Sequence, residues 1–80
     1  MIIDKEDKNA FADYEAAFYK LEMAFGYAKA YIEFHCFVLP PNNKIVEVLN
    51  RKNKKRLCLI CIEGDSPAQA VKDVAAAVRL

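Results

Sequence analysis

The segment Arg56-Leu-Cys-Leu-Ile-Cys-Ile-Glu63, followed by Gly64-Asp-Ser-Pro67 and a run of small residues, decides the fold. Every interior position of the first segment is apolar, so a strand there needs cover on both faces. Ser66 is a good N-cap, Pro67 suits the first helical position, and Gln69 completes a Ser-x-x-Gln capping box. The sequence therefore predicts a strand buried on both sides, a turn, and a helix that starts at Ser66.

A second helix is predicted upstream, from Ala10 to a stop at Gly26. One apolar stripe, at steps of three and four, faces the core: Phe11, Tyr14, Phe18, Leu21 and Phe25. A second apolar stripe, which we call the Tyr19 stripe, lies on nearly the opposite side: Ala12, Ala16, Tyr19, Met23 and Tyr27. A helix on a small domain normally buries one stripe, so the Tyr19 stripe is predicted to be a protein interface. The alternative is that the domain wraps far enough to bury both stripes.

The remaining segments have the two-residue period of strands. Residues 30–39 give one apolar and one mixed face, and Pro40-Pro41-Asn42-Asn43 reverses the chain into a strand over residues 44–50. A polar turn, Asn50 to Lys55, leads into the third strand. The predicted fold class is α+β in the order αβββα, a three-stranded antiparallel meander packed with two helices in one domain, residues 1–80. Whether the helices share one face of the sheet stays open at this point.

Composition excludes several classes of function. The formal net charge is +1, which gives no overall signal for nucleic acid, membrane or acidic substrates. No apolar run approaches the length of a membrane span and no secretory leader opens the chain, so we expect a cytoplasmic protein. Cys36, Cys58 and Cys61 are odd in number and lie in apolar strands, which predicts buried, reduced thiols. The apolar share is 55%, more than so small an interior can hold, which predicts self-association, as a homodimer, or a protein partner.

One charge cluster stands out against this balance. It is the basic loop, with five cations at a predicted hairpin tip: Arg51, Lys52, Lys54, Lys55 and Arg56. Cations that neutralise phosphates release counterions, so a protruding loop of this kind is a candidate nucleic-acid site. The alternative interpretation is a solvated turn whose lysines discourage pairing at the sheet edge.

No other cluster predicts chemistry. Cys58 and Cys61 spell Cys-x-x-Cys, but residues three apart on a strand point to opposite faces, and so do His35 and Cys36 as neighbours. Glu33 and Glu47, on adjacent strands, are candidates for a carboxylate pair, although a Lys-paired sheet face is commoner. We therefore expect a non-enzyme with no metal, no cofactor and no small-molecule substrate.

Two family resemblances follow from these elements. The closing segment, Gly64 to Val78, resembles small bacteriophage proteins of the ABA-sandwich type, which end in a Ser/Thr-Pro turn and an Ala-rich helix after a β-hairpin. This resemblance implies a phage origin, and small phage proteins include inhibitors of host defence such as anti-CRISPR proteins, which act in the bacterial cytoplasm. The element order also resembles a double-stranded RNA-binding domain. Where that family has phosphate-binding lysines, this chain has Pro67, Ala68 and Val71, and its basic loop follows the second strand.

The functional prediction is a non-catalytic protein-binding module, extended by the phage resemblance to an inhibitor that acts by occlusion. The alternative is a nucleic-acid-binding protein that uses the basic loop.

Overall fold

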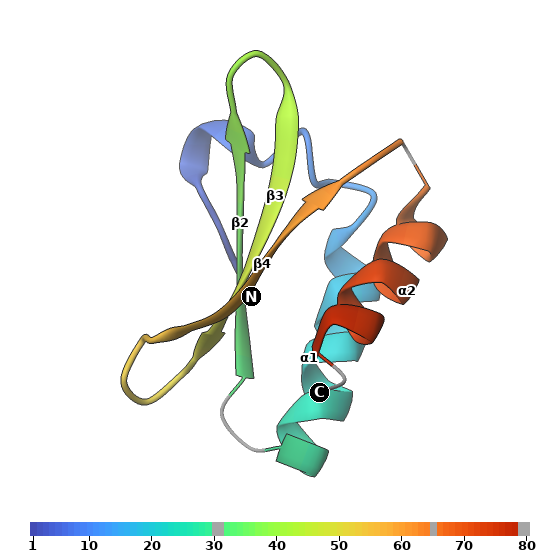
Figure 1. Ribbon diagram of the computed structural model, residues 1–80. Helices are drawn as coiled ribbons and strands as arrows, with labels where there is room; N and C mark the ends of the chain where they lie inside the picture. Colours follow the sequence, from blue (N-terminus) through green and yellow to red (C-terminus); the bar gives the residue numbers. More distant parts are fainter. Residues whose placement is uncertain (30–31, 65, 79–80) are drawn as a thin grey trace.

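The protein is an α+β domain with two helices and a four-stranded mixed sheet of order β1-β2-β3-β4 (Figure 1). The computed structural model describes residues 1–29, 32–64 and 66–78. The elements in chain order are β1 (Ile2–Ile3), the 3-10 turn η1 (Lys5–Asp7), α1 (Glu15–Lys29), β2 (Ile32–Leu39), β3 (Asn43–Asn50), β4 (Arg56–Ile62) and α2 (Pro67–Val78). No helix in the described ranges is long and apolar enough to cross a membrane.

The meander of β2, β3 and β4 is antiparallel, as predicted, with β3 between the other two strands. The predicted three-stranded layout is nevertheless incomplete, because β1 pairs in parallel with β2 through Ile2↔His35 and Ile3↔Cys36. The Asp4 N–H extends this pairing by donating to the Cys36 carbonyl at 3.1 Å. A strand of two residues has no measurable period, so sequence patterning could not reveal it.

Both helices lie on one face of the sheet, which settles the question that the sequence left open (Figure 1). The core forms between them and the sheet, from the first apolar stripe of the chain, the inward side chains of the strands and one face of α2. Its buried members are Phe11, Tyr14, Phe18, Ile32, Phe34, Cys36, Val46, Val48, Ile62, Ala70, Val74 and Val78. Leu21 and Phe25 are partly buried against this cluster. The predicted core stripe is thus confirmed.

Neither α1 nor α2 covers the opposite face of the sheet, and this overturns the prediction that β4 is buried on both sides. Leu57 and Leu59 are 52% and 45% exposed, and Cys61 is exposed too, which also contradicts the expectation of three buried thiols. The other β4 residues, Cys58, Ile60 and Ile62, pack into the core. Apolar residues on both faces of a strand make burial of both faces favourable. They do not ensure it, because α1 and α2 both pack on the same face of this sheet.

The helix boundaries differ from the prediction at one helix and agree at the other. Helix α1 begins at Glu15, five residues after the predicted Ala10, because turns occupy residues 8–14. Gly26 lies inside α1, without the positive φ of a helix stop. Helix α2 follows Ser66, whose Oγ accepts from the Gln69 N–H at 3.3 Å, as predicted. Its capping box is half formed, because the Gln69 side chain donates to Asp73 instead.

Candidate functional site

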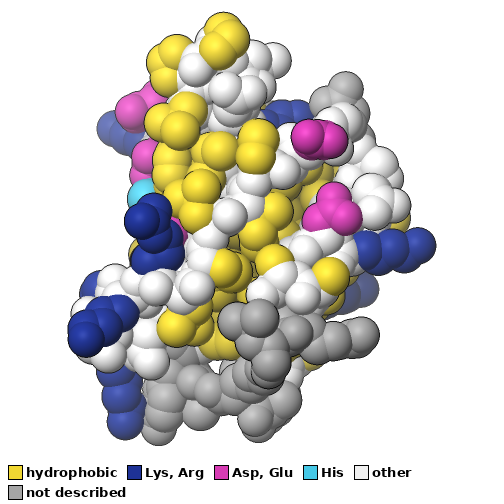
Figure 2. All heavy atoms as spheres, in the orientation of Figure 1, with side chains coloured by type: hydrophobic (Ala, Val, Ile, Leu, Met, Phe, Trp, Pro, Cys, Tyr) yellow, Lys and Arg dark blue, Asp and Glu magenta, His cyan; other side chains and the backbone are white. Residues whose placement is uncertain are grey.

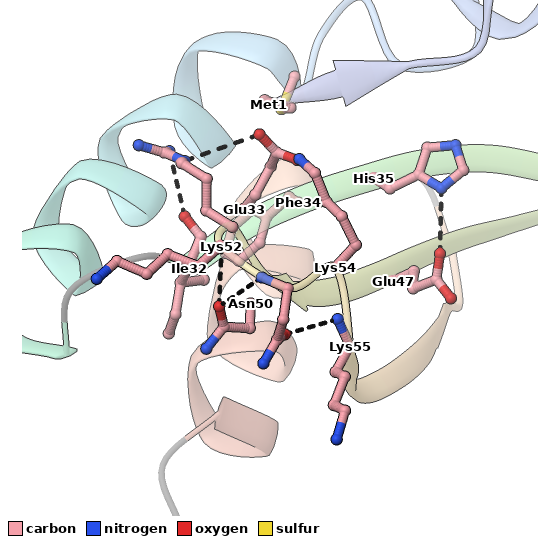
Figure 3. Close-up of polar contacts among 12 residues, drawn as sticks. Met1, Ile32, Glu33, Phe34, His35, Glu47, Asn50, Lys52, Lys54 and Lys55 are labelled. Carbon is pink, nitrogen blue, oxygen red and sulfur yellow. Dashed lines mark hydrogen bonds and ion pairs between the residues drawn. The ribbon is translucent and has the colours of Figure 1, made fainter.

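The basic loop is a tight turn built by two asparagines. Asn50 Oδ1 accepts from the Lys52 N–H at 2.9 Å, and Asn53 Oδ1 accepts from the Lys55 N–H at the same distance (Figure 3). Two backbone hydrogen bonds between Asn50 and the residues Lys54 and Lys55 close the turn, and Lys54 adopts a left-handed φ of 61°. Asparagine side chains commonly substitute for backbone partners in this way. The loop therefore presents its cations from a defined turn.

Arg51, Lys54 and Arg56 of this loop lie near carboxylates from elsewhere in the chain. Lys54 Nζ lies 2.8 Å from Glu33, Arg51 lies 3.7 Å from Glu33, and Arg56 lies 3.7 Å from Glu47. The hydrogen bond from Lys54 lowers the pKa of Glu33, although burial opposes this shift. The acids come from β2 and β3, so the cluster is much less cationic in space than it is along the sequence.

Glu33 and Glu47 share a sheet face but do not form a carboxylate pair. In the strand register Glu33 lies opposite Leu49, whereas Glu47 lies opposite His35. Each carboxylate binds a cation, and the pKa of Glu33 is lowered, whereas a like-charged neighbour would raise it. The Lys-paired interpretation is confirmed for Glu33.

His35 is held between two carboxylates on the open face of the sheet. Its Nε2 lies 2.8 Å from Asp4 Oδ1. Its Nδ1 lies 3.1 Å from Glu47 Oε1, a contact that Figure 3 shows. Partial burial of the ring opposes its charged form, but the hydrogen bonds to Asp4 and Glu47 outweigh this effect and raise the pKa of His35. Both ring nitrogens donate when the imidazole is protonated, so the site favours an imidazolium.

The acidic residues at the start of the chain serve the sheet instead of capping the first helix. Aspartate before a helix is a common N-cap, so either Asp4 or Asp7 is a candidate cap by sequence. In the structure Asp4 binds His35 instead, and Asp7 Oδ2 accepts from the Val38 N–H at 3.0 Å. Sequence reasoning missed both contacts because each joins residues 31 positions apart through the unpredicted β1.

Glu22 is the buried charged residue of the core region, with an exposure of 3%. Its carboxylate accepts from the Phe34 N–H and from the Met1 amino group, both at 2.7 Å, and lies 3.9 Å from Arg51. Helical spacing puts Glu15 and Glu22 together in a polar seam between the two apolar stripes, and for Glu22 this prediction of a polar, exposed position is wrong. The spacing could have indicated that Glu22 is buried, because Phe18, Glu22 and Phe25 follow helical steps of four and three on the buried side of α1.

The Tyr19 stripe lies on the surface. Tyr19 is 55% and Met23 is 42% exposed on α1, and Ala16 is exposed beside them. Ala12 is exposed as well but lies in the turns before α1, and the side chain of Tyr27 lies outside the described residues. The structure thus does not bury the part of this stripe that it describes.

A further apolar surface lies on β4, opposite the helices, and we call Leu57, Leu59 and Cys61 the β4 surface. Figure 2, in the orientation of Figure 1, shows a band of hydrophobic side chains where β4 is nearest the viewer. The register places Glu47 opposite Leu59, and Ile45 opposite Cys61. This surface was missed because β4 was predicted to be covered.

The thiols and the hollows supply no reactive pair within the described ranges. Cys58 packs against the core while Cys61 is exposed, so the two sulfurs diverge as predicted. Burial raises the pKa of Cys36 to about 12, which keeps this thiol protonated. One hollow of about 390 Å³ is lined by Met1, Ile2, Ile3, Lys8 and Glu15, a set of three apolar residues with one lysine and one glutamate. Among the described residues, no three His, Cys, Asp or Glu side chains form a group able to hold a metal ion.

Comparisons of this chain with protein-family models, curated proteins and solved structures found no match.

Proposed function

We propose that this protein is a small non-catalytic protein-binding module that engages its partner through the Tyr19 stripe. The observation that carries the proposal is the exposure of Tyr19 and Met23, 55% and 42%, on a helix whose other side is built into the core. Tyrosine and methionine are enriched at interface centres, because they offer large areas and adapt in shape. Ala16, exposed beside them on α1, lets a partner approach the helix closely, and Ala12 is exposed in the turns before it.

The resemblance of Gly64 to Val78 to small phage proteins extends this proposal. On that basis the partner is a component of a host defence system, and the protein inhibits it by covering a surface that the component needs. A rigid domain of this size suits occlusion, since it requires a complementary surface and no chemistry. The resemblance alone supports this extension.

The alternative, nucleic-acid binding by the basic loop, has less support. Arg51, Lys54 and Arg56 already lie near carboxylates, so a phosphate would have to compete with Glu33 and Glu47. Each phosphate contact that displaces such a pair gains less than a contact made by a free cation. The loop therefore fits a solvated turn better than a phosphate site.

The test of the interface is the double variant Tyr19→Lys/Met23→Lys, with Ala68→Lys/Ala76→Lys on exposed positions of α2 as the control of equal added charge. A photoreactive amino acid at position 16, inside the stripe, reports contacts in the host cell. We expect one discrete crosslinked protein with the wild-type and control backgrounds and none with the double variant, at unchanged circular dichroism. Equal crosslinking in all three backgrounds would contradict the proposal, and unfolding of the double variant alone would show that the stripe is structural.

The alternative has its own experiment. Arg51, Lys52, Lys54 and Lys55 are replaced by Gln, and binding to duplex and single-stranded RNA and DNA is measured across salt concentrations. We expect no salt-dependent binding by the wild-type protein. Binding that weakens with salt and disappears in the variant would favour nucleic acid over a protein partner.

A further inference from the structure

The two edges of the sheet differ in what they offer to another chain. The edge at β1 is two residues long, whereas the edge at β4 is seven residues long. An edge strand presents a row of unpaired N–H and C=O groups, and proteins normally protect it with charges, prolines or a covering element. Residues 57–62 of β4 contain neither a charge nor a proline. Only β4 therefore offers, among the described strands, a ladder long enough for stable pairing.

The exposed apolar side chains of β4 also favour pairing with another strand. Leu57, Leu59 and Cys61 are exposed on the side without helices, and strand pairing would bring these side chains against equivalent ones across the new ladder. The lysines of the basic loop protect the start of the strand only, because they precede residue 57.

From these observations we propose that two copies of this chain pair through β4, antiparallel and around a twofold axis at Leu59, to form one continuous eight-stranded sheet. A twofold axis perpendicular to the sheet places the helix-free faces of both copies on the same side of the eight-stranded sheet. Residues that lie opposite each other across the new ladder must therefore have side chains on the same face. The axis at Leu59 meets this condition. Leu59 faces its own equivalent, and Leu57 faces Cys61 of the second copy.

The charges at the two ends of β4 support the second copy as the occupant. Lys55 and Arg56 lie at one end, and the exposed Glu63 lies just beyond the other. Antiparallel pairing around Leu59 brings Lys55 of each copy beside Glu63 of the other, so two ion pairs form at once. In the β3–β4 register Val48 lies opposite Cys58 and Leu49 lies opposite Arg56, so the irregularity is at Leu57 and the stretch from Cys58 to Ile62 is regular. The strand is thus self-complementary in both apolar and charged residues.

The proposed pairing stops at two copies. After it forms, each end of the eight-stranded sheet is a two-residue β1 strand, too short to recruit a third copy. The dimer is independent of the proposed partner surface, because the Tyr19 stripe is on α1 and stays outside the new ladder.

Sedimentation over a concentration series tests the proposal with a matched pair of leucines. Leu59→Lys places two like charges at the axis and should raise the dimer Kd at least about tenfold. Leu39→Lys, at a 47% exposed leucine on β2, should leave the Kd unchanged. A wild-type protein that stays monomeric would overturn the proposed pairing. A dimer that Leu39→Lys or Tyr19→Lys weakens as much as Leu59→Lys does would also overturn it, because the contact would then lie outside β4.

Two further experiments, a charge reversal and a disulfide crosslink, test the register of the pairing. Lys55→Glu should weaken the dimer about fivefold, and Lys55→Glu combined with Glu63→Lys should restore it, because the ion pairs form again with reversed sign. In a Cys58→Ser/Cys61→Ser background, Leu59→Cys should oxidise to a covalent dimer, whereas Leu39→Cys should not. Failure of both the restoration and the crosslink would exclude the axis at Leu59, even if the protein is a dimer.

Discussion

Replacing Glu22 by alanine is the change that tests the described interior most directly. The carboxylate is 3% exposed and accepts from the Phe34 N–H and the Met1 amino group, both at 2.7 Å. The alanine variant leaves a buried N–H without an acceptor, at a cost of about 1–3 kcal/mol, and a buried ammonium group without its counter-charge. Breaking a buried pair from one side typically costs about 3–5 kcal/mol in total. A domain of 80 residues is stable by only about 4–12 kcal/mol.

Urea unfolding followed by circular dichroism measures this effect. With a denaturant slope of about 1–1.5 kcal/mol/M, a loss of about 3–5 kcal/mol should lower the midpoint of Glu22→Ala by about 2–5 M. Glu22→Gln keeps an acceptor oxygen for Phe34, so its midpoint should lie between those of the alanine variant and the wild type. Glu15→Ala, at an exposed glutamate of the same helix, is the control and should cost less than about 1 kcal/mol. Equal midpoints for the two alanine variants would refute the assignment of Glu22 to the interior.

Three other changes follow from local geometry and are checked in the same unfolding assay. Gly26→Ala should stabilise the protein by about 0.5–1 kcal/mol, because Gly26 lies inside α1 with open space around an added Cβ, and a loss of stability would mean that α1 ends there. Gly64→Ala should destabilise it by about 1–2 kcal/mol, because Gly64 has a φ of +76°, and an unchanged midpoint would contradict that conformation. The raised pKa of His35 means that the folded state binds its proton more tightly than the unfolded state does. Its contribution is therefore complete below the ordinary pKa of about 6.5 and is lost as the pH rises through the higher folded-state pKa, and His35→Gln should flatten this fall in stability above about pH 6.5.

Local signals in the sequence predicted the local parts of the fold. The cap at Ser66 and the start of α2 depend on residues within one turn, and the meander depends on strand periods joined by short turns. These features were recovered because neighbouring residues determine them. Gly26 was misread for a related reason, since a glycine both permits a helix stop and is tolerated inside a helix.

The candidate surfaces needed information that is not local. The exposure of Leu59 depends on where both helices pack, and the neutralisation of the basic loop depends on Glu33 and Glu47, which lie on other strands. The contact between Asp4 and His35 requires β1, which is too short to have a pattern. The exposure of Tyr19 and Met23 is the exception, because two apolar stripes on one helix exceed what a small core can bury.

The segment formed by β1 and η1 has a consequence for the order in which the chain folds and opens. Its contacts with β2 span more than 30 residues, whereas those of the hairpins join near neighbours in sequence. Closing a long loop costs chain entropy before any contact compensates, so this segment docks late on a meander that is already formed. Because β1 has only two paired residues at the edge of the sheet, this segment can detach without unfolding of the whole domain. One detachment would remove Asp4 from His35 and Met1 from Glu22 together, so the amides of β2 along this edge should exchange with solvent by local opening, ahead of those in β3.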